Sequence, residues 1–263
     1  MDASDTPESL DGLCPDGMAL DEWRLRLELA ACYRLFDHLG WTELIYNHIT
    51  LRVPGGDPAN PHFLINPFGL HYSEVTASNL VKIDRAGNKI DASPWPVNPA
   101  GFTIHSTVHG ARDDAHCVMH THTTAGMAIA CKRDGLRYDN FYSALLYGLV
   151  GYHDFEGVTT NPGEAPRLVA SLARNEMLIL RNHGLLALGA GVPEAFDRLW
   201  TLQRACEVQL AADSMHGDNV TIPNAVLERN AEAAHRMNMG PRRGRMPFEG
   251  IRRRAAIRFA DLV

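Results

Sequence analysis

Residues 117–122, CVMHTH, constrain the fold most strongly, because an apolar run ends there in two histidines two positions apart. In a β-strand successive side chains alternate between the two faces, so His120 and His122 point to the same side. Two imidazoles on one face can bind one ion. Among 13 histidines in 263 residues, however, such a spacing also arises by chance. The pair alone is compatible with a metal site and with two hydrogen-bonded histidines of the core.

A third histidine follows a second apolar run. His183 comes after residues 177–180, MLIL, at a turn where Gly184 lets the backbone come close. Three histidines plus an open coordination position are typical of zinc, iron and manganese enzymes. We therefore predict that His120, His122 and His183 bind a divalent metal. Zn is the first choice, and Fe(II), Mn or Co are alternatives. The competing interpretation is three core histidines bonded to backbone carbonyls.

The remaining pattern mixes helices and short strands without regular βαβ repeats. Apolar residues three or four positions apart predict helices at 21–40, 98–112, 123–132, 164–174 and 192–215. Short β-rich segments predict strands at 47–55, 62–70, 116–122 and 177–189, with a hairpin at 80–91. The order of these elements indicates a mixed α/β or α+β sandwich.

Composition narrows the kind of partner. A hydrophobic content of 45% is ample for a core, and a net charge of -6 disfavours nucleic acid and anionic membranes. We therefore expect a small-molecule substrate. The five cysteines are widely spaced and include no CxxC pair, a pattern typical of reduced thiols in a cytoplasmic protein. No signal peptide or membrane-spanning run is evident.

Three regions are predicted along the chain. Residues 1–20 are polar and expected to be flexible, residues 21–218 form the main domain, and residues 219–263 form a helical, Arg-rich extension. Seven arginines lie between positions 242 and 258. We interpret this basic segment as a solvated arm that packs on a neighbouring subunit, in preference to a site for an anionic partner.

Five segments in order resemble the class II aldolase/adducin superfamily over roughly residues 22–215: NHITLRVPG, LINPFGL, AGFTIHSTVHGARDDAHCVMHTHT, ILRNHGLLALG and EAF. The resemblance implies a three-layer α/β/α sandwich around a mainly antiparallel sheet. It also implies a homotetramer with active sites at the subunit boundaries. The metal-binding histidines of that family correspond to His120, His122 and His183.

The sequence departs from the sugar-phosphate aldolases of this superfamily. Their glutamate base lies about 19 positions before the first ligand histidine, where this chain has Gly101. Several phosphate-holding donors correspond to His48, to Phe68-Gly69 and to Pro99-Ala100, most of which cannot donate hydrogen bonds from their side chains. We therefore expect an unphosphorylated ligand, with aromatic acids among the candidates. The predicted substrate-binding residues are His48, Asn66, Phe68, Gly69, Gly101 and His105.

The roles of individual residues around the predicted metal stay open at this point. His48 and His105 could face a substrate carboxylate or be packed, hydrogen-bonded histidines. For proton chemistry we select Tyr142 and His153 from the aromatic-rich segment 140–157, since a tyrosine of the adjoining chain often serves as the acid in the related family. Aromatic residues at helical spacing are also typical of a core.

Three functions compete. The first is a metal-dependent carbon–carbon lyase, a decarboxylase or aldol-type enzyme, acting on an unphosphorylated oxo- or hydroxy-acid through a metal-stabilised enolate. Decarboxylation fits the missing glutamate better, because no proton has to be removed first. The second is a three-histidine non-haem iron oxygenase. The third is a non-catalytic, adducin-like assembly domain, which would have little reason to keep three ligand histidines.

Overall fold

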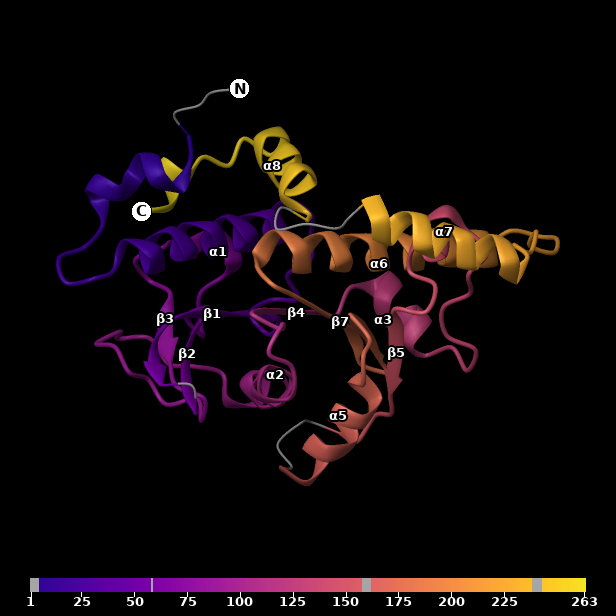
Figure 1. Ribbon diagram of the computed structural model, residues 1–263, viewed down its shortest axis with the longest axis horizontal. Coiled ribbons are helices and arrows are strands. Elements are labelled where there is room, and N and C mark those ends of the chain that lie inside the picture. Colours follow the sequence, from indigo (N-terminus) through magenta and orange to yellow (C-terminus); the bar gives the residue numbers. More distant parts are fainter. Residues whose placement is uncertain (1–4, 58, 158–161, 238–242) are drawn as a thin grey trace.

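One seven-stranded sheet with helices on both faces forms the body of the protein (Figure 1). The computed structural model describes residues 5–57, 59–157, 162–237 and 243–263, without the side chains of residues 99–101 and 162. The strand order is β3-β2-β1-β4-β7-β6-β5; β5 and β6 are parallel and all other neighbours are antiparallel. The strands are β1 (His48–Asp57), β2 (Asn60–Ile65), β3 (Val81–Ile83), β4 (Cys117–Thr121), β5 (Val150–His153), β6 (Met177–Leu180) and β7 (Gly184–Gly189).

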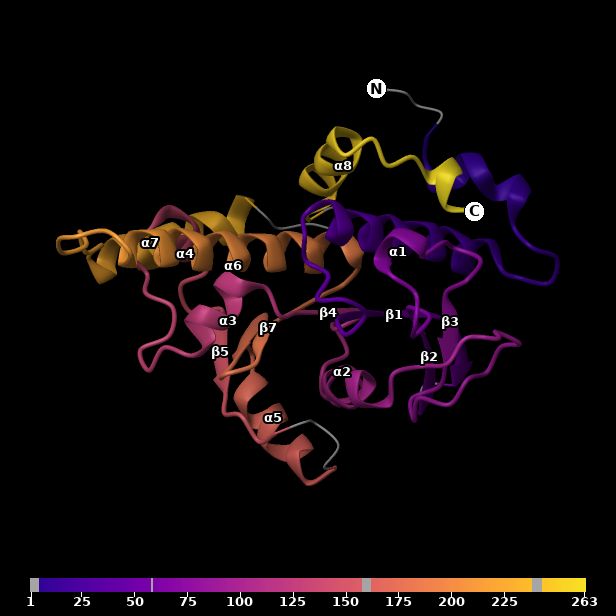
Figure 2. The ribbon, with the colours of Figure 1, turned by 180° about the vertical axis from the view of Figure 1, so that it is seen from behind.

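Helices form the two outer layers, as both ribbon views show (Figures 1 and 2). Helices α1, α3, α4 and α6 cover one face of the sheet, and α2 and α5 cover the other. Among the described residues, no helix is both long and apolar enough to cross a membrane. The helices are α1 (Leu20–His38), α2 (Pro99–Ala111), α3 (Thr124–Ala130), α4 (Phe141–Leu145), α5 (Ala165–Leu172), α6 (Val192–Asp213), α7 (Asn224–Met237) and α8 (Arg245–Arg254), with 3-10 helices η1 (Pro7–Leu13), η2 (Tyr72–Glu74), η3 (Pro162–Glu164) and η4 (Phe259–Leu262).

β4 is the central strand, and all five of its residues are buried. Cys117 and Met119 belong to the large core beneath α1 and α6, whereas Val118 belongs to the smaller core beneath α2 and α5. His120 has the same parity as Val118, so it faces the α2 and α5 layer. There it lies opposite His48 of the neighbouring strand β1. The predicted three-layer sandwich with a mainly antiparallel sheet is confirmed.

The segment predicted as a hairpin contributes only one strand to the sheet. Val81–Ile83 forms β3 on β2, and its last residue makes an isolated bridge to Lys89. Between them the Asp84 carboxylate accepts the backbone N–H of Asn88 at 2.9 Å. This side-chain bond closes the predicted turn locally, as aspartate often does. The second arm of the predicted hairpin therefore adds no further strand.

Both ends of the chain pack on α1 and α6. Within the segment expected to be flexible, η1 lies on α1, where Trp23 Nε1 donates to Leu10 O at 3.0 Å. At the other end, α8 contacts α6 and α1, and Arg245 pairs with the buried Glu28 of α1. The basic segment is thus held by the acidic groups of its own chain. The boundaries at residues 20 and 218 remain predictions.

Arg252 joins the two ends of the chain. Its buried guanidinium pairs with Asp5 Oδ2 at 2.6 Å and Glu249 Oε2 at 2.8 Å, and donates to Ile257 O at 2.7 Å. Its guanidinium carbon Cζ also lies over the ring of Phe259, 4.2 Å from the ring centroid. Every direction of the guanidinium plane is therefore occupied, which suits arginine and not lysine.

We predict that Arg252→Ala lowers the free energy of unfolding by about 3 kcal/mol, because it removes a buried cation and leaves two partly buried carboxylates without their partner. Chemical denaturation measures the change. Arg253→Ala is the matched control, since Arg253 is the next residue of α8 and is exposed. Equal stability of the two variants would contradict a central role for this ion pair.

Candidate metal centre

His120 is held by the sheet in one defined orientation. Its Nδ1 lies 2.9 Å from Leu185 O on β7, and its Nε2 lies 2.7 Å from Nε2 of His122. A carbonyl can only accept, so the hydrogen of the neutral ring is on Nδ1. The lone pair therefore lies on Nε2, the atom that faces the other histidines. A backbone carbonyl behind a metal-ligating histidine is a common way to fix its tautomer.

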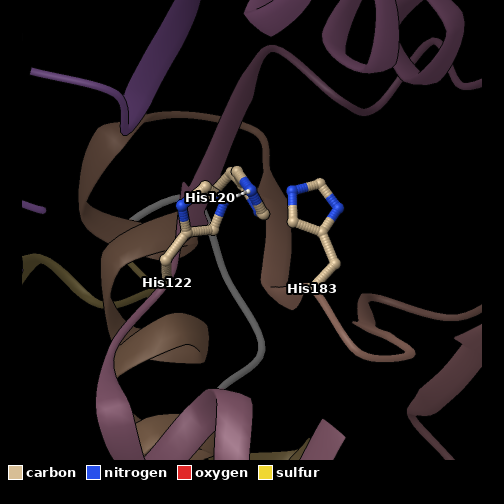
Figure 3. Close-up of side chains that lie close together, drawn as sticks. All are labelled: His120, His122 and His183. Carbon is tan, nitrogen blue, oxygen red and sulfur yellow. Dashed lines mark hydrogen bonds between the residues drawn. The ribbon is translucent and has the colours of Figure 1, made fainter. Parts of the chain in front are cut away.

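The rings of His122 and His183 lie close to the ring of His120, so that the three imidazoles form one group (Figure 3). His122 follows β4 directly, and His183 lies in the tight turn between β6 and β7, where its N–H donates to Leu180 O at 3.0 Å. The ring centroid of His120 lies 4.5 Å from that of His122 and 4.8 Å from that of His183. One nitrogen from each ring lies within 4.8 Å of the others. Within the described ranges, this is the one group of three or more potential ligands close enough to share an ion.

Gly184 makes this approach possible. A Cβ at that position would lie 2.2 Å from Thr121 O, 3.1 Å from a ring carbon of His122 and 3.2 Å from a ring carbon of His120. The first distance is far below any real contact. Only glycine therefore allows β7 to begin directly against the end of β4, where the histidines meet.

Burial favours the neutral form of all three imidazoles. Burial lowers the pKa of His120 well below its usual value, and burial together with His122 lowers that of His183 to about 4, against an opposing effect of Glu164. Burial also lowers the pKa of His122. Neutral imidazole nitrogens with free lone pairs are the donor set that divalent zinc, iron, manganese and cobalt accept. The residues present thus fit a divalent metal.

A second histidine group borders the first on the side of β1 and α2. The ring of His48 lies 5.5 Å from that of His120 and meets the ring of His105 edge to face at 4.3 Å between centroids. Behind them, the Thr50 hydroxyl lies 2.7 Å from both His105 Nδ1 and His109 Nε2. All four side chains are buried. Two of the predicted substrate-binding residues, His48 and His105, therefore do lie beside the candidate ligands.

A buried carboxylate lies on the other side, next to His183. Glu164 Oε1 is 3.1 Å from His153 Nε2, and His153 Nδ1 is 3.1 Å from Ser171 Oγ. Glu164, His153 and His183 line one small cavity, together with Phe155 and Arg181. Because both ring nitrogens of His153 already have partners, this residue is suited to orienting Glu164.

The other predicted site residues are found elsewhere in the chain. Tyr142 packs edge to face on Trp200 and lies beneath Arg204, in the α6 layer. Asn66 is buried, with Oδ1 accepting from the Tyr33 hydroxyl at 3.1 Å. The loop after β2 holds Phe68, whose N–H donates to Pro96 O at 3.0 Å, and the exposed Gly69. Gly101 lies in the first turn of α2. The side chains of residues 99–101 are outside the described part of the structure.

Sequence reasoning missed Thr50, His109 and Glu164. Thr50 shares its strand face with His48, and His109 follows His105 by one helical turn, so both spacings carried a usable signal. Glu164 is a single acidic residue beyond a loop, and no pattern in the sequence connects it with His153 or His183.

Comparisons with known proteins agree with this architecture. The model of the Class II Aldolase and Adducin N-terminal domain matches residues 27–210. A Pseudomonas aeruginosa protein provisionally named an aldolase class 2 protein is 48% identical over 206 residues, which is 78% of each chain. Alpha-adducin from Rattus norvegicus is 45% identical over 214 residues, covering 79% of this chain but only 29% of the adducin.

A solved structure matches over most of its length. The aldolase II superfamily protein from Pseudomonas syringae superposes with a TM-score of 0.83 at 40% identity, over 91% of this chain and 96% of that chain. The fold, the sequence identity and the family model agree, and the resemblance inferred from the histidine motifs is confirmed. This chain belongs to the class II aldolase and adducin family.

Proposed function

We propose that this protein is a divalent-metal-dependent lyase that cleaves a carbon–carbon bond in a small, unphosphorylated oxo- or hydroxy-acid, by decarboxylation or aldol-type cleavage. The observation that carries the proposal is the convergence of three neutral histidines, one of them fixed in its tautomer by Leu185 O. Zinc is our first choice of metal. We further propose a cytoplasmic homotetramer, a setting in which the five free cysteines would remain reduced.

A bound divalent ion would supply positive charge to stabilise the negative charge that develops on a substrate oxygen when the neighbouring carbon–carbon bond breaks. The chain contributes the geometry. β4 and β7 hold His120 from behind, and Gly184 lets the strand ends close around the rings. Preorganisation of this kind avoids reorganisation during the reaction.

We assign proton transfer to Glu164 and its orientation to His153. The aldolase glutamate is replaced by Gly101, but Glu164 places another buried carboxylate in the cavity that His183 lines. Its hydrogen bond to His153 fixes one carboxylate oxygen, and Ser171 fixes the opposite side of the imidazole. Tyr142 faces Trp200 in its own chain, so we retain it as an acid only for the site of a neighbouring subunit.

The matches to adducins favour a second candidate, a non-catalytic assembly domain. Rattus norvegicus alpha-adducin is nearly as similar to this chain as the bacterial relative is. An assembly domain needs neither a metal nor turnover. Metal content and product release therefore separate the two candidates.

We predict that the purified chain binds about one divalent ion, and that His183→Ala or His120→Ala lowers its zinc affinity at least about 100-fold, because a ligand is lost from the ion. Competition with a chromophoric chelator measures the affinity. His116→Ala is the control, since His116 is exposed and precedes β4. Unchanged affinity in both ligand variants would refute the metal centre.

Gly184→Ala tests the same centre without removing a ligand. The added methyl group cannot fit 2.2 Å from Thr121 O, so we expect the strand ends to separate and zinc affinity to fall at least about 10-fold. Gly12→Ala is the control, because Gly12 is exposed, has no positive φ and has no atom within 4 Å of an added Cβ. Normal zinc binding by Gly184→Ala would show that close approach at this turn is not required.

The reaction is tested by incubating the zinc-loaded protein with 2-oxo acids, aliphatic hydroxy-acids and aromatic hydroxy-acids, and measuring carbon dioxide and carbonyl products. For an accepted acid, Glu164→Gln should lower kcat by about 100-fold or more through loss of a proton-transfer group, with bound zinc unchanged. Glu228→Gln, on the exposed side of α7, is the control. A zinc-loaded protein that turns over none of these acids would favour the assembly domain.

A further inference from the structure

A second cavity lies between the last turns of α1 and the segment that follows α8. Its volume is about 290 Å³, which is close to the lower limit for small-molecule sites. Both ribbon views show the C-terminal segment beside α1 (Figures 1 and 2). The lining residues are Arg34, Asp37 and His38 of α1 and residues 255–258, 261 and 262 of the C-terminal segment. None of them belongs to the candidate metal centre.

Arg34 provides a positive charge at a fixed place in this cavity. The side chain is partly buried, and its Nε donates to Val75 O at 3.0 Å. Burial lowers the pKa of Arg34, against opposing effects of Asp37, Asp261 and Glu74. Within the described residues, Arg34 forms no ion pair, and its two terminal nitrogens have no hydrogen-bond partner. These N–H groups are therefore available to an anion in the cavity.

Two carboxylates line the same cavity. Asp37 Oδ1 lies 3.5 Å from His71 Nδ1, so this carboxylate already has a polar neighbour. In the part of the chain that the structure describes, the carboxylate of Asp261 has no hydrogen-bond or ion-pair partner, although it is close enough to Arg34 to raise the pKa of that residue. Arg258, the other arginine of the cavity, is exposed. Opposite charges therefore line one cavity without pairing with each other.

This distribution of charge favours a ligand that carries both signs. A simple anion would be attracted by the two arginines but repelled by the two aspartates, and a simple cation would experience the reverse. A zwitterion can place each of its charges beside the opposite one. Ile257 and Leu262 line the cavity too, and their apolar groups suit an aliphatic side chain. A free amino acid combines these three properties in a small molecule.

We propose that this cavity binds a free aliphatic α-amino acid, with the carboxylate of the ligand on Arg34 and its ammonium group on Asp261. The planar guanidinium can donate two parallel hydrogen bonds to a carboxylate. Asp261 suits the ammonium group better than Asp37 does, because Asp37 already lies beside His71. A ligand held in this way joins α1 to the C-terminal segment. The proposal does not depend on the proposed function.

L-Leucine and two analogues test the proposal. Isocaproate lacks the ammonium group of leucine, isoamylamine lacks its carboxylate, and calorimetry gives the affinity of the protein for each. A chelator in every sample prevents leucine from binding through a metal at the histidine centre. We expect leucine to bind at least about 10-fold more tightly than either analogue, because each analogue leaves one charged group of the cavity unpaired. Equal affinities for leucine and isocaproate, or no binding of leucine, would overturn the proposal.

Two variants test the position of the ligand. Arg34→Gln should weaken leucine binding at least about 10-fold, through loss of a charge-assisted pair of hydrogen bonds. Asp261→Asn should weaken it about threefold, as expected for an exposed ion pair, and it removes no contact that the fold needs. Arg254→Gln and Asp218→Asn are the controls, since both residues are exposed and lie outside the cavity. Leucine binding that neither cavity variant weakens would contradict the proposal.

Thermal unfolding provides a second measurement. A ligand that binds only the folded chain raises the midpoint of unfolding, and leucine at about ten times its dissociation constant should raise it by roughly 3 °C. His183→Ala should show the same increase, because the cavity shares no residue with the metal-binding histidines. An increase that is lost in His183→Ala would place leucine at the histidine centre and overturn the proposal, whereas absence of zinc binding would overturn only the proposed function.

Discussion

The pairing of β4 between β1 and β7 is the constraint on which the rest of the structure depends. Both faces of β4 are buried, so each of its side chains must match one of two cores. The alternation gives Cys117 and Met119 to one layer and leaves His120 on the other. Antiparallel pairing then brings His48 opposite His120, and the turn before β7 brings His183 to the same end of the sheet. One register thus assembles residues that are far apart in the sequence.

Burying so many imidazoles is unfavourable unless each polar nitrogen has a partner. The structure meets this condition on the far sides of the cluster, through Leu185 O for His120 and Ala115 O for His109. It does not meet it in the middle, where Nε2 of His105 and Nδ1 of His48 are unpaired. Stability alone would favour apolar side chains there. Unsatisfied groups gathered at one point are characteristic of a site organised for a ligand.

The sequence predicted the features that depend on local periodicity. Strand alternation placed His120 and His122 on one face, and apolar spacing located most helices and strands. The pairing of Glu164 with His153 could not be predicted, because it joins a residue after a long loop to the end of a parallel strand. The same holds for the basic segment: its arginines looked solvated by composition, yet Arg252 finds Asp5 across almost the whole chain. Such contacts depend on tertiary packing, which produces no periodic pattern in the amino-acid sequence.

The glycine at position 101, where the family resemblance implies a glutamate base, has a different meaning once the fold is known. Judged by sequence position alone, the site has lost its carboxylate and resembles a domain that no longer reacts. Judged in space, Glu164 is buried beside His183 and oriented by His153. A domain that served only for assembly would have no reason to keep Gly184 against Thr121 O, since a larger residue and apolar partners would fill that space with less desolvation. The glycine, the three histidines and the nearby carboxylate together support the proposal that a small, positively charged ion binds between them.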